Sequence, residues 1–266
     1  MIFGENEIDL IEHLQDFWLS GINKTELLPS PTPELEDIVY KICDKENWNK
    51  WTVSSGKSDP PPDFYSDEYR LMMDVMRVND HEQKGKKGKL HNPSMAHEKE
   101  MLKELEQAGI LEQFPNAKIF LNGDTQLPTY EDHNYNLYLK CFKRVLTKHI
   151  NSIALYKKNH PGYKVIFFIF DESSAYFEAD HIINPKRQVQ QGEQLSGRPH
   201  IFFADNSFLD AFIGKGIDYL FWYTPYKLFE QIEPPLTLPT LCVYDLSEKE
   251  FPRIEFEETK MSSVEI

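Results

Sequence analysis

The sequence is poor in cysteine, and its three cysteines form no metal-binding or disulfide pattern. Cys43, Cys141 and Cys242 stand far apart in apolar segments, so we expect reduced, buried thiols. The sequence contains no Cys-x-x-Cys pair and no His-Glu-x-x-His pattern, which disfavours a structural zinc site. This cysteine usage is typical of a cytoplasmic protein.

Long apolar runs are also missing. The chain begins Met1-Ile2-Phe3-Gly4-Glu5, which lacks the basic start of a signal peptide, and no later run approaches the length of a transmembrane helix. We therefore expect no membrane partner. The Gly-x-Ser-x-Gly elbow is absent as well, and Ser55-Gly56-Lys57-Ser58 lacks the first glycine of a phosphate loop. An α/β-hydrolase triad and an ATPase are both disfavoured.

Basic residues are outnumbered by acidic ones, 29 to 43, and the net charge is −14. Such a surface repels nucleic acid over most of its area but leaves room for a local basic groove. An acidic protein can also bind a basic protein, or imitate nucleic acid towards a DNA-binding protein. DNA and another protein both stay open as partners.

The alternation of strand-like and helix-like segments indicates the fold class. We predict a single α/β domain over 1–250, with a mixed central sheet flanked by helices, and a charged, frayed tail over 251–266. Val165–Phe170 is continuously apolar and is predicted to be a strand buried on both faces. We further expect helices over 5–21, from 32 onwards, and over 94–108, 133–158 and 207–212. Residues 63–78 are expected to form a hairpin that turns near 66–67. Further strands are expected over 117–121, 200–204, 217–223 and 241–246.

The most informative residue is Asp74, which interrupts the apolar strand Leu71-Met72-Met73-Asp74-Val75-Met76. An ionised carboxylate in such surroundings is costly to bury unless a cation or hydrogen-bond donors satisfy it. Asp74 is therefore a candidate metal ligand or catalytic carboxylate. Two other interpretations stay open: a buried aspartate held by backbone donors or an arginine, and an exposed aspartate on an edge strand.

A second aspartate, Asp63, follows Pro60-Pro61-Pro62 and precedes Asp74 by eleven residues. Across a hairpin the two carboxylates would face each other, and they would repel unless a divalent cation lay between them. Mg²⁺ prefers oxygen ligands of this kind. Aspartate after proline is also common in turns, so a turn residue is the alternative for Asp63.

Pro62-Asp63, a ten-residue spacer and Asp74-Val75-Met76 together resemble the motif of the PD-(D/E)XK nucleases. The resemblance covers about residues 5–80. It implies a restriction-endonuclease-like fold in which Asp63 and Asp74 are catalytic and bind Mg²⁺. Met76 departs from the motif, because it stands at the lysine position and can neither donate a proton nor carry charge.

The same resemblance implies a further catalytic carboxylate on the first helix. Glu12 is the residue chosen for that role, and little separates it from the other acids of the segment, Glu7, Asp9 and Asp16. Lys57 and Lys84 are the nearest lysines in sequence that could replace the one missing at position 76.

A basic, glycine-rich segment follows the hairpin. Its lysines are Lys84, Lys86, Lys87 and Lys89, and its composition predicts a loop. A basic loop beside a metal site would contact DNA phosphates. A solvated loop without a ligand is the alternative.

Two further groups of polar residues are candidates for ligand binding. Asp171-Glu172 ends the apolar strand, and ligands of α/β sheets bind at the carboxyl ends of strands; a simple strand end is the alternative. Tyr130-Glu131-Asp132-His133 carries metal-binding side chains, but neighbouring residues rarely converge on one ion. A helix N-terminus accounts for acids at that position equally well.

The paired aspartates predict a divalent-cation site, and the resemblance to PD-(D/E)XK nucleases implies a Mg²⁺-dependent DNA endonuclease that hydrolyses phosphodiester bonds. The alternative is a catalytically silent α/β protein that binds another protein, such as a bacterial or phage accessory or defence-related factor. Met76 and the net charge of −14 favour this second hypothesis.

Overall fold

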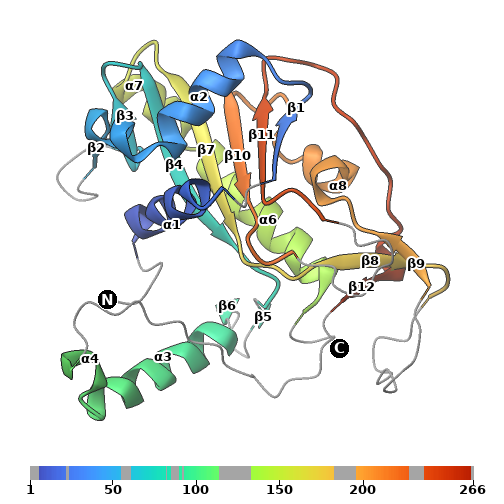
Figure 1. Cartoon of the computed structure of the whole chain (residues 1–266). Helices are drawn as coiled ribbons and strands as arrows, with labels where there is room; N and C mark the ends of the chain where they lie inside the picture. The colour runs from blue at the N-terminus through green and yellow to red at the C-terminus, as the bar shows by residue number, and fades with distance from the viewer. Residues whose placement is uncertain are drawn as a thin grey trace.

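The computed structural model of the chain describes residues 6–21, 24–54, 61–81, 83–84, 90–91, 93–113, 133–182, 196–227 and 237–264. These residues form one α/β domain around a seven-stranded sheet with the order β1-β11-β10-β7-β4-β3-β2 (Figure 1). The sheet is mixed, because β1–β11, β10–β7 and β7–β4 pair in parallel and the other neighbours pair antiparallel. The predicted fold class is confirmed.

The strands of this sheet are β1 (Thr25–Leu28), β2 (Thr52–Val53), β3 (Phe64–Ser66), β4 (Leu71–Val78), β7 (Lys164–Asp171), β10 (Tyr219–Tyr223) and β11 (Leu241–Asp245). A three-stranded sheet contains β8 (Tyr176–Ala179), β9 (Gly197–Pro199) and β12 (Met261–Ser263), and a two-stranded one contains β5 (Gln83–Lys84) and β6 (Leu90–His91). The helices are α1 (Glu7–Leu19), α2 (Pro33–Cys43), α3 (Pro93–Gln107), α4 (Ile110–Gln113), α6 (Tyr135–Ile150), α7 (Ile153–Asn159), α8 (Asn206–Leu209) and the 3₁₀ helices η1 (Lys45–Lys50), η2 (Phe202–Ala204) and η3 (Glu258–Lys260).

Helices cover both faces of the large sheet (Figure 1). In β7, the alternate residues Val165, Phe167 and Ile169 belong to the core that also contains α6, α7 and α8. The intervening Ile166, Phe168 and Phe170 belong to the core that contains α1 and α2. Successive side chains of a strand point to opposite faces, so a continuous apolar run requires both faces to be covered. The prediction of a strand buried on both faces is confirmed.

The β4–α6–β7 unit positions the polar centres described below. β4 and β7 pair in parallel over eight residues, from Leu71 opposite Lys164 to Val78 opposite Asp171. Asn134 caps α6 by accepting hydrogen bonds from the backbone N–H groups of Asn136 and Leu137. The apolar stripe of α6 packs in the same core as Met72 and Met76 of β4. Every second residue of β4, Asp74 among them, therefore points towards α6.

Three predicted segments were wrong. The expected helix over 133–158 is two helices, α6 and α7, which are separated at Asn151 and Ser152, residues whose side chains compete with helical hydrogen bonds. The strand expected over 200–204 is instead the 3₁₀ helix η2, because a short apolar run does not distinguish a strand from a buried turn of helix. The tail is not frayed over 251–264, since β12 pairs with β8. The strand expected over 117–121 lies outside the described residues.

Within the described part of the chain, no helix combines the length and the apolar character needed to cross a membrane.

Truncation of Phe168 tests the central strand. Phe168 is 0% exposed, so we expect Phe168→Ala to lower the free energy of unfolding, measured by urea denaturation, by about 3–5 kcal/mol. Leu155→Ala is the control, because Leu155 is 47% exposed and its truncation should change the same quantity by less than about 0.5 kcal/mol. Equal losses in the two variants would contradict the described core.

Candidate functional site

The pairing of β3 with β4 brings Asp63 opposite Asp74. Phe64 lies opposite Met73 and Tyr65 opposite Met72, and Asp63, the residue just before β3, interacts with the Asp74 side chain. The backbone N–H of Val75 donates a hydrogen bond to Asp63 Oδ2 at 2.8 Å. The structure thus brings together the two carboxylates that the hairpin pattern predicted to meet, while their catalytic role stays a prediction.

Asp74 is 3% exposed, and side chains from α6 and α7 contact its carboxylate. The Tyr156 hydroxyl donates to Asp74 Oδ2 at 2.6 Å, and His149 Nδ1 contacts the same oxygen. Burial and the Asp74 charge raise the pKa of Tyr156, which keeps its hydroxyl protonated as a donor. The described partners of Asp74 are therefore an imidazole and a phenol, not the backbone donors or the arginine considered from the sequence.

The Asp63 carboxyl is hard to ionise in these surroundings. Burial and the nearby Asp74 charge raise its pKa to about 8, with a smaller contribution from Glu7, while the hydrogen bond from Val75 opposes the shift. Two carboxylates this close do not both ionise without a compensating positive charge. Near neutral pH Asp63 therefore keeps its proton, unless a bound cation takes the place of that proton.

The other residues singled out from the sequence lie as follows. Glu12 is exposed on α1, and the α1 acid whose charge raises the pKa of Asp63 is Glu7. Met76 is 4% exposed in the apolar core. Of Lys84 only the backbone is described, in β5. The remaining candidate lysines, Lys57, Lys86, Lys87 and Lys89, lie outside the described residues.

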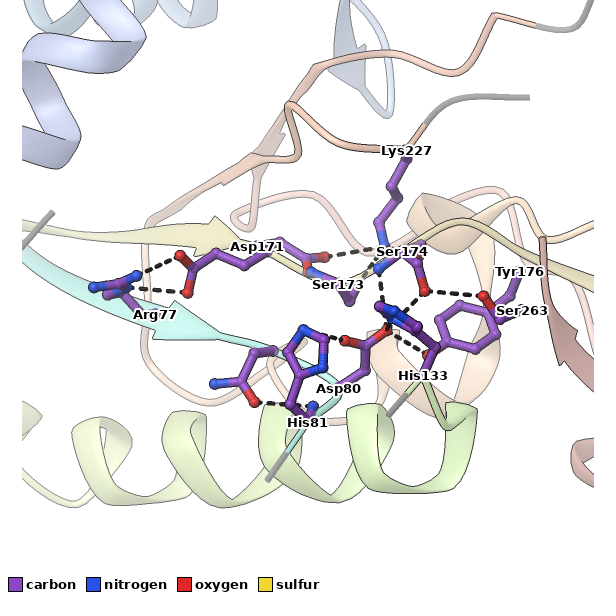
Figure 2. Close-up of polar contacts among 12 residues, drawn as sticks. Arg77, Asp80, His81, His133, Asp171, Ser173, Ser174, Tyr176, Lys227 and Ser263 are labelled. Carbon is purple, nitrogen blue, oxygen red and sulfur yellow. Dashed lines mark hydrogen bonds and ion pairs between the residues drawn. The ribbon is translucent and has the colours of Figure 1, made fainter. Parts of the chain in front are cut away.

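A second buried carboxylate centre lies at the carboxyl ends of β4 and β7 (Figure 2). Asp171 is the last residue of β7, Asp80 follows β4 by two residues, and both are 0% exposed. Ligands of α/β sheets bind at this edge. The neighbouring Glu172, by contrast, forms an ion pair with Arg77.

Asp171 accepts hydrogen bonds from three elements. Its Oδ2 atom accepts from the Tyr138 hydroxyl of α6 at 2.5 Å and from Trp222 Nε1 of β10 at 2.8 Å. Its Oδ1 atom accepts from the Ser173 backbone N–H at 2.9 Å and from the Ser173 hydroxyl at 2.7 Å. A buried carboxylate is tolerated when it is bonded in this way.

Lys227 is a buried lysine beside Asp171. Its side chain is 2% exposed, and Nζ lies 3.5 Å from Asp171 Oδ2. The ammonium donates to Ser173 Oγ at 2.6 Å and to the Ser174 carbonyl oxygen at 3.1 Å. Burial lowers the pKa of Lys227, while the charges of Asp171 and Asp80 oppose that shift. Lys227 therefore links the two aspartates through the serine pair.

Asp80 is surrounded by hydroxyl groups and imidazoles. Its Oδ2 atom accepts from the Ser174 backbone N–H at 3.1 Å, the Ser174 hydroxyl at 2.8 Å and the Tyr176 hydroxyl at 2.6 Å. His81 Nε2 lies 3.3 Å from Oδ1, and His133 Nδ1 lies 3.5 Å from Oδ2. These partners lower the pKa of Asp80 to about 2 against the effect of burial, so Asp80 is ionised at neutral pH.

Sequence reasoning identified only part of this second centre. Asp171 was a candidate, and His133 was weighed only against its neighbours in sequence, whereas Asp80, His81 and Lys227 were missed. Asp80 lies just past the carboxyl end of β4, at an even-numbered position like Asp74 and Val78. Ligands of α/β sheets bind at the carboxyl ends of strands, and this rule, applied to β4 as it was to β7, would have identified Asp80. Lys227 carried no local signal, because its partners come from β7 and the loop that follows it.

Comparison of the chain with protein-family models, with curated proteins and with solved structures found no match. The geometry of the two carboxylate centres therefore carries the functional inference.

The pKa of Asp63 predicts a pH-dependent stability. The folded-state pKa of about 8 lies above the ordinary value of a free aspartate, so the folded protein binds the extra proton and stability falls as pH rises from about 4 to about 8. We expect Asp63→Asn, whose amide oxygen still accepts from Val75, to lose this part of the pH dependence. Urea unfolding at several pH values measures it. Wild-type and variant curves that stay parallel across this range would refute the shift.

Proposed function

We propose that this chain is a nuclease-like protein that hydrolyses DNA phosphodiester bonds with a divalent cation held by Asp63 and Asp74. The observation that supports the proposal is the pair of opposed carboxylates, one of which has a pKa of about 8. A cation between them would remove the cause of that high pKa. The pattern Pro62-Asp63 followed by Asp74 on the next strand is the resemblance to PD-(D/E)XK nucleases that supplies the reaction class.

The donor atoms of this pair suit Mg²⁺. Mg²⁺ binds carboxylate oxygens and keeps several waters, and a bound ion would act as a Lewis acid on the phosphate and lower the pKa of a water molecule. The hydrogen bonds from Val75 and Tyr156 engage Oδ2 of Asp63 and of Asp74. These bonds hold the two carboxylates in fixed orientations.

His149 is the protein group best placed to handle a proton at this pair. Its Nδ1 atom contacts Asp74, and an imidazole nitrogen can accept or donate a proton. Met76, at the position of the family's lysine, is apolar and buried. In the proposed function His149 is the proton donor or acceptor beside the metal, and Glu7 of α1 adds negative charge near Asp63.

A second candidate function is a catalytically silent α/β protein that binds another protein. The burial of Asp74 favours it, since a carboxylate that is 3% exposed and already bonded to Tyr156 needs no cation to be stable. The burial of Met76 favours it as well. A net charge of −14 suits a basic partner better than a DNA duplex.

A cleavage assay separates the two functions. With Mg²⁺ or Mn²⁺ we expect the wild type to cut plasmid and single-stranded DNA, and we expect Asp74→Asn and Asp63→Asn to lower the rate at least about 100-fold, because the loss of a metal ligand removes several kcal/mol of transition-state stabilisation. Activity should rise as pH passes about 8, where Asp63 ionises and can bind the metal.

Asp37→Asn is the matched control, because the Asp37 side chain is 53% exposed on α2 and lies outside the site. It should cut at the wild-type rate. No metal-dependent cutting, together with no change in thermal stability on addition of either ion, would exclude the nuclease and leave the silent binding protein.

A further inference from the structure

Three metal-binding side chains converge at the carboxyl end of β4. Asp80, His81 and His133 each offer one ligand atom, and these atoms lie within 4.8 Å of one another. Figure 2 shows both imidazole rings beside the Asp80 carboxylate. Asp80 and His81 follow β4, whereas His133 comes from the segment just before α6, so only the fold brings the three together.

One oxygen of the Asp80 carboxylate receives no hydrogen bond within the described part of the chain. Oδ1 is buried and accepts none from the described residues, whereas Oδ2 accepts three. Buried polar atoms are nearly always hydrogen-bonded, so a fully buried, ionised carboxylate with one such oxygen calls for a specific partner. The His81 imidazole lies beside this oxygen, with its Nε2 atom 3.3 Å away.

The charges of the centre also leave room for a cation. Asp80 and Asp171 contribute two negative charges, and Lys227, which lies beside Asp171, contributes at most one positive charge. Protonated imidazoles compensate the Asp80 charge themselves, but neutral imidazoles, the form that binds metals, leave the described residues of this network with at least one net negative charge. A divalent ion at Asp80 would compensate that charge.

We propose that Asp80, His81 and His133 bind one transition-metal ion of the Zn²⁺ class and leave at least one coordination position to water. One carboxylate and two imidazoles form a donor set that suits Zn²⁺, Mn²⁺ or Fe²⁺ more than Mg²⁺ or Ca²⁺, which prefer oxygen. Ligand atoms of a tetrahedral zinc ion lie roughly 3.3 Å apart, so side-chain rotations that bring the imidazole nitrogens closer by at most about 1.5 Å would close the site. Zinc sites with three protein ligands and a water are the catalytic type.

The surroundings of Asp80 resemble the outer shell of a metal site. Ser174 and Tyr176 fix the orientation of its carboxylate, as outer-shell partners of a ligand do. The side chains of His81 and His133 are 13% and 17% exposed, which gives an ion and a water molecule access from solvent. The Asp80 carboxylate is therefore held in place by hydrogen bonds, while the two imidazoles are partly exposed to solvent.

This site is separate from the Asp63–Asp74 pair. Asp74 and Asp80 are six residues apart along β4 and its extension, a span of about 20 Å. Zinc binding can be measured without nucleic acid, so the proposal stands or fails independently of the nuclease.

Metal titration of the full-length protein tests the proposal. After removal of metal with a chelator, we expect isothermal calorimetry with Zn²⁺ to give one tight site per chain, and Co²⁺ to give the visible absorption of a site with imidazole ligands. His81→Ala and His133→Ala should each weaken Zn²⁺ binding at least about 100-fold, and Tyr176→Phe, which removes an outer-shell hydrogen bond, about 10–100-fold.

His181→Ala is the matched control, because His181 is an exposed histidine outside the cluster. It should bind Zn²⁺ as the wild type does. Circular dichroism and thermal unfolding of each metal-free variant establish that it is folded. Zinc binding that is absent from the wild type, or that persists unchanged in folded His81→Ala and His133→Ala, would overturn the site and leave a pair of histidines that interact with Asp80 as simple cations.

Discussion

The burial of the Asp171 carboxylate is the constraint on which the carboxyl edge of the sheet depends. An ionised carboxylate inside an apolar core costs several kcal/mol unless donors surround it. Its donors are Tyr138 of α6, Trp222 of β10 and Ser173 of the loop after β7. Because α6 and β10 are distant in sequence from Asp171, satisfying this one carboxylate fixes the positions of both elements relative to β7. It also places Ser174 where it bonds Asp80.

The antiparallel packing of α6 along β4 relates the two candidate centres. His133 lies just before α6 and His149 near its end, which corresponds to about 24 Å of helix. Asp80 and Asp74 are about 20 Å apart along the strand direction. Helix and strand segment are therefore similar in length, and both Asp74 of β4 and Asp80 just after it contact one histidine from the α6 segment. The first centre opposes two acids, whereas the second combines Asp80 and Asp171 with two imidazoles and Lys227.

Much of the fold could be predicted from local patterns. The apolar run of β7, the hairpin of β3 and β4 and the meeting of Asp63 with Asp74 follow from a period of two residues and from turn chemistry. The break between α6 and α7 was missed although Asn151 and Ser152 are a local signal for it. The pairing of β12 with β8 did not follow, because it depends on contact between distant segments. The donors to Asp74 were missed for the same reason: Tyr156 is 82 residues away in sequence.

The sequence by itself determined the α/β class, the two-sided burial of the central strand and the presence of aspartates that an apolar strand cannot leave unsatisfied. Only the tertiary structure decided how each charge is met. The alternation of side chains along a strand predicts which face of the sheet each side chain lies on, but the helix that covers that face supplies its hydrogen-bonding or charged partner. Three contacts between residues distant in sequence are of this kind, and no local pattern encodes them: His149 with Asp74, His133 with Asp80, and Lys227 with Asp171.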